Sequence, residues 1–531
     1  MRTRFYNARI LTMKDFDVFS GEVWIEDNKI IYVGKVKTST FCFDREIDVH
    51  QNLIMPGFIN AHTHSGMTFL RSMADDMPLQ QWLKERVFPI EEKLTQEDIY
   101  FFSKLAILEY LTSGITTNFD MYLNPEAIVH ASLDMNYRTV LCGAVNDFCL
   151  SVEDVERCFN EYNQKNSLIS YILGFSHEYT NSKEKIQQVA ALSHKYKAPV
   201  YTHLSETEYE VNTCKEKTGR SPIEYLCDLG VYDYGGGAFH CVHMSTHDLD
   251  LFAKKHLNVI TNPASNLKLA SGIAPIQSML QRNINVCLGT DGAASNNCLD
   301  MFREMFLVIG LAKYKEKDAS AVDAYEVLKM ATVNAAKALH LNCGVLEVGK
   351  LADLIILDLH QPNMQPINNV AKNIVYSGSK FNVKCTMVNG KILYEDGHFH
   401  VGFEIEALYD EVQKKGREVN AMNIQIFGKN KCFDTKKAQR YFKERNIKFQ
   451  FINLDEKEMS KKEFESVLRQ VGIDSMIDPK AKDKELLTML NYLSNKEDKV
   501  YLNQHILKTP IVRNCKLATV GYEPNVWKTW D

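Results

Sequence analysis

Apolar and polar positions change their spacing several times along this chain, and each change predicts a different kind of structure. Residues 1 to about 55 contain short apolar or alternating runs, FYNARIL, GEVWIED and KIIYVG, separated by glycine or asparagine. Such runs are typical of β-strands, and the residues between them are typical of turns. We therefore expect short strands in the first part of the chain.

A second pattern begins near Pro56. Eight short β-like runs lie between Ile54 and Gly292, and most are separated by windows with apolar residues at helical spacing, such as DIYFFSKLAILEYLTSG. Strands that alternate with helices in this way predict an α/β fold with a parallel sheet. Eight of them predict a sheet closed into a (β/α)8 TIM-type barrel.

Short strands return at about residue 344, in GVLEVGKLADLIILDL and VKCTMVNGKILYEDG. Strands on both sides of one barrel predict a small β-sandwich domain built from both flanks, 1–55 and 344–400, around a barrel at 56–343. A polar helical window at 401–421 is expected to be a linker. Residues 422–531 then alternate strands and helices again, which predicts a separate C-terminal α/β domain.

Composition narrows the class of protein. The chain has 531 residues, and 62 basic against 67 acidic side chains give a net charge of −5, which argues against a nucleic-acid or polybasic membrane partner. No apolar window is long enough for a spanning helix, and the first residues lack the pattern of a secretory signal. The thirteen cysteines show no paired spacing, so we expect free thiols and a cytoplasmic location.

Candidate chemistry gathers at the ends of the predicted barrel strands. His62 and His64 are two residues apart at the end of an apolar strand, so their imidazoles share one face. His203 ends a later strand and Asp291 follows the last one. Imidazoles and a carboxylate at the mouth of a barrel suit a divalent metal, with zinc first and iron or nickel as alternatives.

Three further residues lie near those strand ends. Glu206 could reach the metal through a turning loop, or could cap the helix that follows, because SETE resembles a capping box. His240 and His243 are three residues apart, so only one of them can face inward from a regular strand. A metal would lower the pKa of bound water, and a nearby carboxylate could carry the proton. The residues therefore predict a hydrolytic site whose leaving group stays open.

Four separated motifs then resemble one family in order: PGFINAHTHSGMTFLRSMADDMPLQQWL, THLSETEYEV, HCVHM and LGTDGAASNNCLDMFREM. They are similar to the metal-dependent amidohydrolase superfamily, and most of all to its methylthioadenosine/S-adenosylhomocysteine deaminase and chlorohydrolase branch. The resemblance covers about residues 1–400. It implies one metal ion per chain, whose ligands would be His62, His64, His203 and Asp291.

The resemblance also implies catalytic and substrate roles. Glu206 would be the proton shuttle, His240 would orient the water and the tetrahedral intermediate, and Asp291 would act as ligand and base. The family reaction is attack of metal-bound hydroxide on an amino-bearing ring carbon, with release of ammonia. His243 is expected to be structural.

Substrate contacts would come from Trp82, Glu91 and His177. Trp82 could stack on a purine or be a core aromatic, and Glu91 could accept ribose hydroxyls or be a solvated helix residue. Ser176 occupies the position where the family carries a histidine, and strict alternation would turn His177 to the opposite face. The arginines that the family uses for a carboxylate tail are not evident, so a smaller nucleoside or another heterocycle (guanine, pterin or triazine type) remains an alternative.

Residues 422–531 resemble the arsenate-reductase/Spx-like branch of the thioredoxin fold. Cys432 would be its reactive thiol at a helix N-terminus, with Lys429, Lys431 and Lys436 lowering its pKa. Pro510 matches the family's cis-proline. Two functions follow: a purine-nucleoside deaminase with a small-molecule substrate, or a thiol-redox regulatory or binding protein acting through Cys432. A homo-oligomer is expected from the resemblance.

Overall fold

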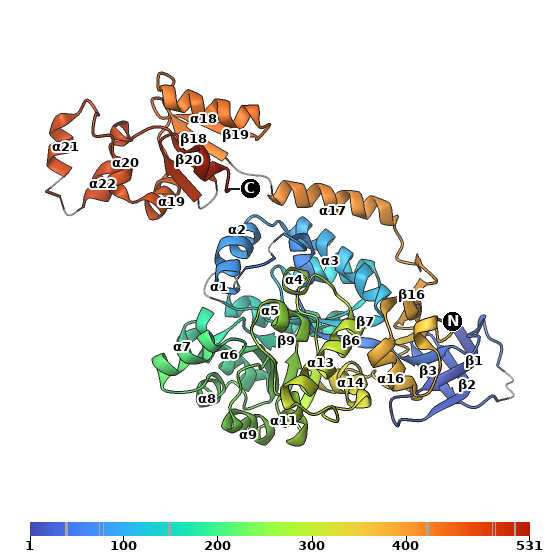
Figure 1. Cartoon of the computed structure of the whole chain (residues 1–531). Helices are drawn as coiled ribbons and strands as arrows, with labels where there is room; N and C mark the ends of the chain where they lie inside the picture. The colour runs from blue at the N-terminus through green and yellow to red at the C-terminus, as the bar shows by residue number, and fades with distance from the viewer. Residues whose placement is uncertain are drawn as a thin grey trace. The chain divides into compact units, whose positions relative to one another are not determined.

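The computed structural model describes residues 1–37, 41–73, 75–77, 79–146, 150–420, 424–490, 492–493, 495–514 and 517–530 (Figure 1). The chain forms two compact units. One contains Met1–Leu83 and Leu94–Lys415, and the other contains Lys84–Lys93 and Gly416–Asp531. Each unit is treated on its own below.

A barrel of eight parallel strands lies at the centre of the first unit, which confirms the predicted TIM-type fold. Hydrogen bonds link the strands in chain order, and the backbone N–H of Asp291 donates to the carbonyl of His62 at 2.9 Å, which joins the last strand end to the first. The strands are β6 (Phe58–Thr63), β7 (Ile115–Asp120), β8 (Arg138–Cys142), β9 (Ile169–Gly174), β10 (Val200–Leu204), β11 (Gly236–His240), β12 (Asn258–Thr261) and β13 (Asn285–Leu288).

The barrel strands are buried almost throughout, because side chains fill the interior and helices cover the outside. Inside, large apolar side chains such as Phe119, Tyr201 and Phe239 belong to one buried cluster. The longer helices that connect or follow the strands are α3 (Gln96–Thr112), α4 (Pro125–Asp134), α5 (Val152–Lys165), α6 (Lys183–Tyr196), α7 (Glu208–Thr218), α8 (Pro222–Asp228), α9 (Thr246–Lys254), α13 (Met301–Glu316) and α14 (Ala324–Met330).

Short helical segments follow several strand ends and shape the mouth of the barrel. Those that follow a strand end are η1 (Ser65–Leu70) after β6, α10 (Pro263–Lys268) after β12 and α12 (Ala293–Asn296) after β13. Further short helices of the first unit are α1 (Leu79–Trp82), α11 (Ile276–Gln281) and α15 (Val333–Ala338). Many of the helices begin with a serine or threonine that accepts from the third residue of the helix. Examples are Thr95 before α3, Ser151 before α5 and Ser245 before α9.

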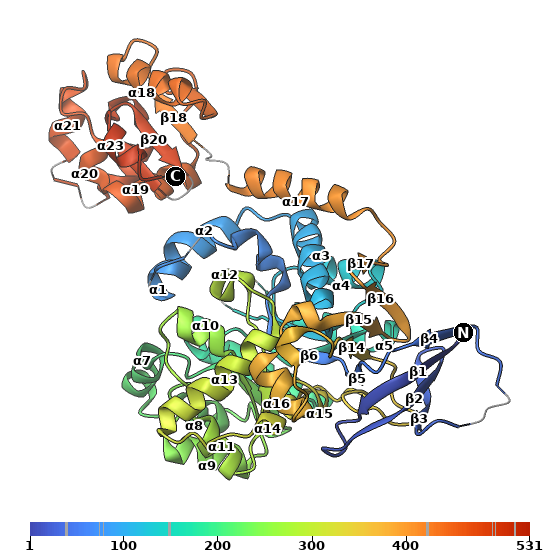
Figure 2. The same ribbon diagram turned by 45° about the vertical axis from the view of Figure 1, so that its right-hand side comes forward.

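One nine-stranded sheet combines strands from both flanks of the barrel (Figure 2). Its members are β1 (Arg2–Leu11), β2 (Val18–Glu26), β3 (Lys29–Gly34), β4 (Arg45–Asp48), β5 (Leu53–Pro56), β14 (Leu354–Leu357), β15 (Val383–Val388), β16 (Lys391–Glu395) and β17 (His398–Phe399). The two flanks meet where β5 pairs with β14. A buried ion pair between Arg138 and Asp353, with Nε and Oδ2 2.9 Å apart, joins this sheet to the barrel.

The second unit has a four-stranded mixed sheet in the order β19-β18-β20-β21. Only β18 and β19 are parallel, and α18 connects them. The Thr509–Pro510 peptide is cis, as the resemblance implies. The elements are α2 (Phe88–Glu91), β18 (Ile424–Gly428), α18 (Phe433–Glu444), β19 (Phe449–Asn453), α19 (Lys461–Val471), α20 (Ile473–Met476), α21 (Lys484–Leu490), α22 (Lys496–Tyr501), β20 (Ile511–Asn514), β21 (Leu517–Val520) and α23 (Pro524–Trp527).

Two observations complete the fold. Helix α17 (Ile405–Asn420) spans the division between the units, within the window that was expected to be a linker. A search of the described helices finds none with the length and apolar character needed to cross a membrane.

Candidate active site

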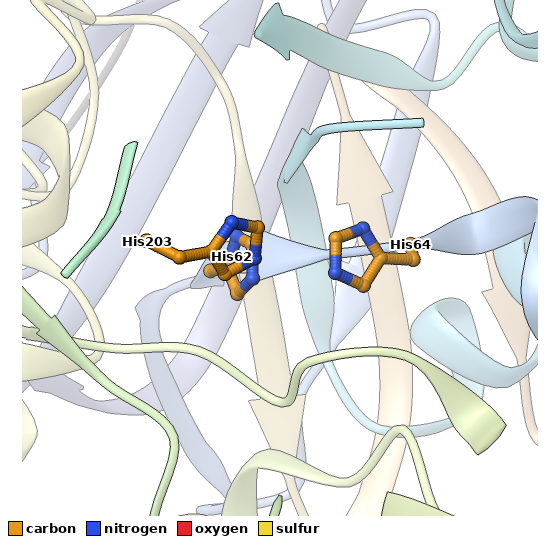
Figure 3. Close-up of side chains that lie close together, drawn as sticks. All are labelled: His62, His64 and His203. Atoms are coloured by element: carbon orange, nitrogen blue, oxygen red, sulfur yellow. The ribbon is translucent and has the colours of Figure 1, made fainter. Parts of the chain in front are cut away.

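Three imidazoles converge at the carboxyl end of the barrel (Figure 3). His62 lies in β6, His64 follows that strand and His203 lies in β10. One ring nitrogen from each lies within 4.8 Å of the others, and His62 and His203 are buried. The spacing argument for His62 and His64 therefore holds in the structure, because both rings turn to the same side.

Hydrogen bonds hold two of these rings by their Nδ1 atoms. His203 Nδ1 lies 2.8 Å from the carbonyl of Ser176, and His64 Nδ1 contacts the carbonyl of Met121. Such contacts keep a proton on Nδ1, so Nε2 of each ring is the atom that a metal would bind after the loss of any proton it carries. Neither nitrogen of His62 has a hydrogen-bond partner within the described residues, although the side chain is fully buried. A buried imidazole in this state fits a metal ligand.

Asp291 lies beside the imidazoles, just after β13. Its Oδ1 is 3.2 Å from His64 Nε2 and 3.7 Å from His62 Nε2. Its Oδ2 accepts from the hydroxyls of Ser265 and Ser295 at 2.6 and 2.8 Å. Burial alone would raise the pKa of Asp291, but the hydrogen bond and charge of His64 hold it well below its usual range. The carboxylate is thus ionised and aimed at the imidazoles.

Glu206 also reaches this space. Its Oε2 lies 3.9 Å from His240 Nε2, and its Oε1 accepts from Ser271 Oγ at 3.3 Å. Burial raises the pKa of Glu206 above its ordinary value. The alternative that Glu206 caps the next helix is wrong, because Thr207 is the N-cap of α7 and accepts from the N–H of Glu210.

The two histidines at the end of β11 have different surroundings. His240 Nδ1 lies 2.7 Å from Asn266 Oδ1, which leaves Nε2 directed at Glu206. His243 Nε2 instead lies 2.6 Å from the carbonyl of Ser271. His240 therefore belongs to the cluster, whereas His243 contacts the backbone.

His177 also lies at the cluster. Its ring stacks on that of His203 with centroids 4.4 Å apart and an interplanar angle of 14°. The expectation from strict strand alternation is wrong here because β9 ends at Gly174, before this residue. Burial, followed by the charge of His240, lowers the pKa of His177 to about 3.

The other two predicted substrate residues lie on short helices. Trp82 ends α1 and is buried. Glu91 ends α2, which belongs to the second unit. Their proposed contacts with substrate stay predictions.

Sequence reasoning missed the polar side chains that support the cluster. Asn266, Ser265 and Ser295 follow strands β12 and β13, where they contact His240 or Asp291. A run of polar residues after a buried strand, as in NPASN, is the signal that could have identified two of them.

Cys432 lies in the second unit as the N-cap residue of α18. Burial raises its pKa, but hydrogen bonds with Thr435 and Thr509, and with backbone N–H groups at the start of the helix, lower it overall. The helix N-terminus thus acts as expected. The predicted role of Lys429 is not seen, because its Nζ donates to the carbonyl of His505 at 2.9 Å.

Comparisons with known proteins agree with this geometry. The model of the amidohydrolase family matches residues 53–393. A 5-methylthioadenosine/S-adenosylhomocysteine deaminase of Thermoanaerobacter pseudethanolicus is 37% identical over 424 residues, which cover 78% of this chain and 98% of that protein. One of Acetivibrio thermocellus is 40% identical over 401 residues, covering 73% and 93%.

Solved structures show the same relationship. A zinc-bound adenosine deaminase of Xanthomonas campestris is 28% identical, with a TM-score of 0.74, and the match covers 78% of this chain and 98% of that one. An atrazine chlorohydrolase of Arthrobacter aurescens, at 21% identity and a TM-score of 0.72, shares the fold over 78% of this chain and all of its own. The chain therefore belongs to the amidohydrolase family.

Proposed function

We propose that this chain is a metal-dependent hydrolase that deaminates a purine nucleoside of the adenosine, methylthioadenosine or S-adenosylhomocysteine type and releases ammonia. One observation carries the proposal: the cluster of imidazoles and carboxylates at the carboxyl end of the barrel. Relatives that match nearly over their whole length are named as deaminases of this substrate class, which supports the same activity here.

One divalent ion fits the donor set. His62, His64, His203 and Asp291 would hold it, since they offer three imidazole nitrogens and an ionised carboxylate at one point. Zinc is the first choice for such ligands, and iron or nickel are alternatives. When bound, the ion supplies Lewis-acid chemistry and lowers the pKa of a water ligand.

Glu206 and His240 would handle the proton. Their facing atoms are 3.9 Å apart, so both can contact one water or leaving group between them. Burial raises the pKa of Glu206, which lets its carboxyl accept a proton from water and return it to the departing amine. His240, held by Asn266 through Nδ1, presents Nε2 as an acceptor in a constant direction.

Substrate contacts are assigned to Trp82, Glu91 and His177. His177 has the clearest position, because its ring stacks on His203 at the edge of the cluster. Trp82 would stack on the base and Glu91 would accept ribose hydroxyls. A different heterocycle, of the guanine, pterin or triazine type, is the alternative within the same chemistry.

The test is a deaminase screen of metal-loaded protein, with metal content measured on the same sample. The panel would contain adenosine, 5′-deoxyadenosine, methylthioadenosine, S-adenosylhomocysteine, guanine and pterins. We expect ammonia release from a purine nucleoside and about one ion per chain. Glu206→Gln should lower kcat at least about 100-fold with the ion retained. Unchanged turnover in that variant would contradict the mechanism.

We also infer that the C-terminal domain is thioredoxin-like. Its support is the sheet order with only β18 and β19 parallel, the helix α18 between them, and Cys432 at the start of that helix. A thiol-redox or binding role through Cys432 is the second candidate function, favoured by the lowered pKa of this thiol. A homo-oligomer and a cytoplasmic location complete the proposal, the latter supported by the free state of all eleven cysteines described.

A further inference from the structure

The turn that carries Glu206 has an uncommon backbone conformation. Strand β10 ends at Leu204, and Ser205 has a φ of +51°, in the left-handed region that residues with a Cβ rarely adopt. The carbonyl of Ser205 accepts from the N–H groups of Val242 and His243 at 3.0 and 2.9 Å. The N–H groups of Ser205 and Glu206 still need acceptors, because both residues are buried.

Glu210 supplies both acceptors. Its Oε1 lies 2.5 Å from the N atom of Ser205, and its Oε2 lies 2.8 Å from the N atom of Glu206. Only a carboxylate offers two equivalent oxygens to two adjacent N–H groups. Glu210 is not needed to cap α7, since Thr207 already does so. Its side chain is 1% exposed, so its contacts are with the protein rather than with water.

A second buried carboxyl group contacts the first. Glu178 follows His177 in the loop after β9 and is 6% exposed. No side-chain N–H or hydroxyl in the described parts of the chain donates to it. Burial and the charge of Glu210 raise the pKa of Glu178 well above its usual range. Burial also raises the pKa of Glu210 to about 7, and its hydrogen bonds with the N–H groups of Glu206 and Ser205 oppose that rise. The two carboxyl groups interact, so a proton held by Glu178 would join it to the Glu210 carboxylate.

We propose that Glu210 is a positioning residue for Glu206. Its carboxylate holds the two N–H groups of the turn, and Glu178 steadies that carboxylate from the loop that carries His177. The carboxyl pair would thus fix the proton shuttle relative to the substrate side of the site. This inference rests on the proposed deaminase function, in which Glu206 carries the proton.

The first experiment compares Glu210→Gln with Glu208→Gln, an exposed glutamate in the same turn of α7. Glutamine offers one acceptor oxygen and places an amide N–H against a backbone N–H. We expect Glu210→Gln to lower kcat about 10- to 100-fold, with KM within about threefold and metal content unchanged. Glu208→Gln should match the parent.

A double-mutant cycle separates positioning from general structural damage. If Glu210 acts through Glu206, Glu210→Gln should cause no further loss of kcat in a Glu206→Gln background. An equal loss in both backgrounds would overturn the proposal, as would a Glu210→Gln variant with the kcat of the parent. If Glu210→Gln does not fold, Glu210→Asp takes its place in the same cycle, with a smaller loss expected.

Glu178 is tested by two substitutions. Glu178→Gln keeps a donor toward Glu210 and should stay within about threefold of the parent kcat. Glu178→Met removes the donor and should lower kcat, again only where Glu206 is present. Equal activity of the two variants would contradict the role of Glu178.

Amide hydrogen exchange supplies a readout that needs no activity. The peptide covering residues 203–211 should exchange faster in Glu210→Gln than in the parent or in Glu208→Gln, and an unchanged rate would overturn the proposal. A metal-loaded parent with no deaminase activity on the panel would instead count against the proposed function, while the exchange rates would still decide whether Glu210 holds the turn.

Discussion

His62 and His243 show how surroundings separate one imidazole from another at the residue scale. His62 is fully buried, stacks on Phe239 with centroids 3.8 Å apart, and has no hydrogen bond from either nitrogen to the described residues. His243 uses Nε2 to contact the carbonyl of Ser271. The surroundings of His62 lower the stability of the folded chain unless a cation binds the ring, whereas His243 already has a hydrogen-bonding partner.

This difference predicts the effect of metal removal. A ligand that binds only the folded state stabilises it, by about 2.7 kcal/mol at a free concentration 100 times Kd. We expect a chelator to lower Tm by several degrees in the parent and in His243→Gln. In His62→Gln, the Tm should no longer respond to chelator or to added zinc. Differential scanning calorimetry would measure these shifts, and an undiminished response in His62→Gln would exclude His62 as a ligand.

At the scale of the element, the strand ends at the barrel mouth determine where these residues lie. Gly289 shows this most clearly. A Cβ at Gly289, just after β13, would lie 2.8 Å from both Cβ and the backbone N of His62. Backbone atoms cannot move aside cheaply, so the close approach of β13 and β6 requires glycine here. Gly310 is an exposed glycine in α13 with no atom within 4 Å of such a Cβ.

Alanine at these two glycines should therefore have opposite effects. Gly289→Ala should lower both metal content and Tm, because His62 would have to shift. Gly310→Ala should leave metal content unchanged and raise the free energy of unfolding by about 0.5–1 kcal/mol, the usual gain in a helix interior. Metal analysis and urea unfolding of both variants check this, and a Gly289→Ala protein with full metal content would contradict the steric argument.

Helix α13 supports the same mouth through a buried carboxyl group. Glu304 accepts from the N–H of Ala264 and from Asn296 Nδ2, at 3.0 and 2.7 Å, and thereby ties the segments after β12 and β13 to α13. Burial raises the pKa of Glu304 to about 8. In the unfolded chain a glutamate titrates near about 4.3.

The raised pKa of Glu304 predicts a pH-dependent stability. Between about pH 4.3 and 8 the folded chain keeps a proton that the unfolded chain has lost. The contribution of Glu304 is then greatest at low pH and declines as pH rises, by at most about 1.4 kcal/mol per unit. Glutamine does not titrate, so Glu304→Gln should gain stability relative to the parent from pH 5 to pH 8.5.

Urea unfolding at several pH values measures that difference. The control is Glu316→Gln, an exposed position at the end of the same helix, whose difference from the parent should not vary over this range. A pH-independent difference between Glu304→Gln and the parent would show that Glu304 is ionised in the folded state.

The site residues at strand ends could be predicted from the sequence pattern, whereas those in the loops after the strands could not. Buried apolar runs in the sequence indicate where the strands end, so His62, His203 and Asp291 could be placed at strand ends from their spacing alone. The positions of His177 and Glu206 depend on the loops after β9 and β10, where Ser205 takes a positive φ. Alternation along a strand does not extend into such loops, so the sequence pattern could not show where these side chains point.

At the scale of the whole chain, some features could likewise be predicted from the sequence and others could not. The barrel was predictable because eight strands are buried on both faces and alternate with helices. The order of the nine-stranded sheet was not, because the pairing of β5 with β14 joins residues about 300 positions apart that share no local pattern. The Nζ of Lys429 donates to the carbonyl of His505, because charge near Cys432 in sequence need not face its side chain.

Two units with different chemistry in one chain predict separable thiol and hydrolase reactions. Cys432 has a lowered pKa and is half-buried, while buried thiols such as Cys142 and Cys241 have raised pKa values. Because the thiolate is the reactive form, iodoacetamide at pH 6.5 should modify Cys432 before the other described cysteines. Cys42, a free and exposed thiol, is the matched comparison for access. Peptide mass spectrometry over time gives the order, and Cys432→Ser should abolish the fast phase while Cys42→Ser keeps it.

Under reducing conditions, metal-loaded Cys432→Ser should retain the parent kcat within about twofold. A larger loss there would place Cys432 in the hydrolytic reaction, and a parent in which Cys42 reacts first would remove the basis for a redox role of the second unit.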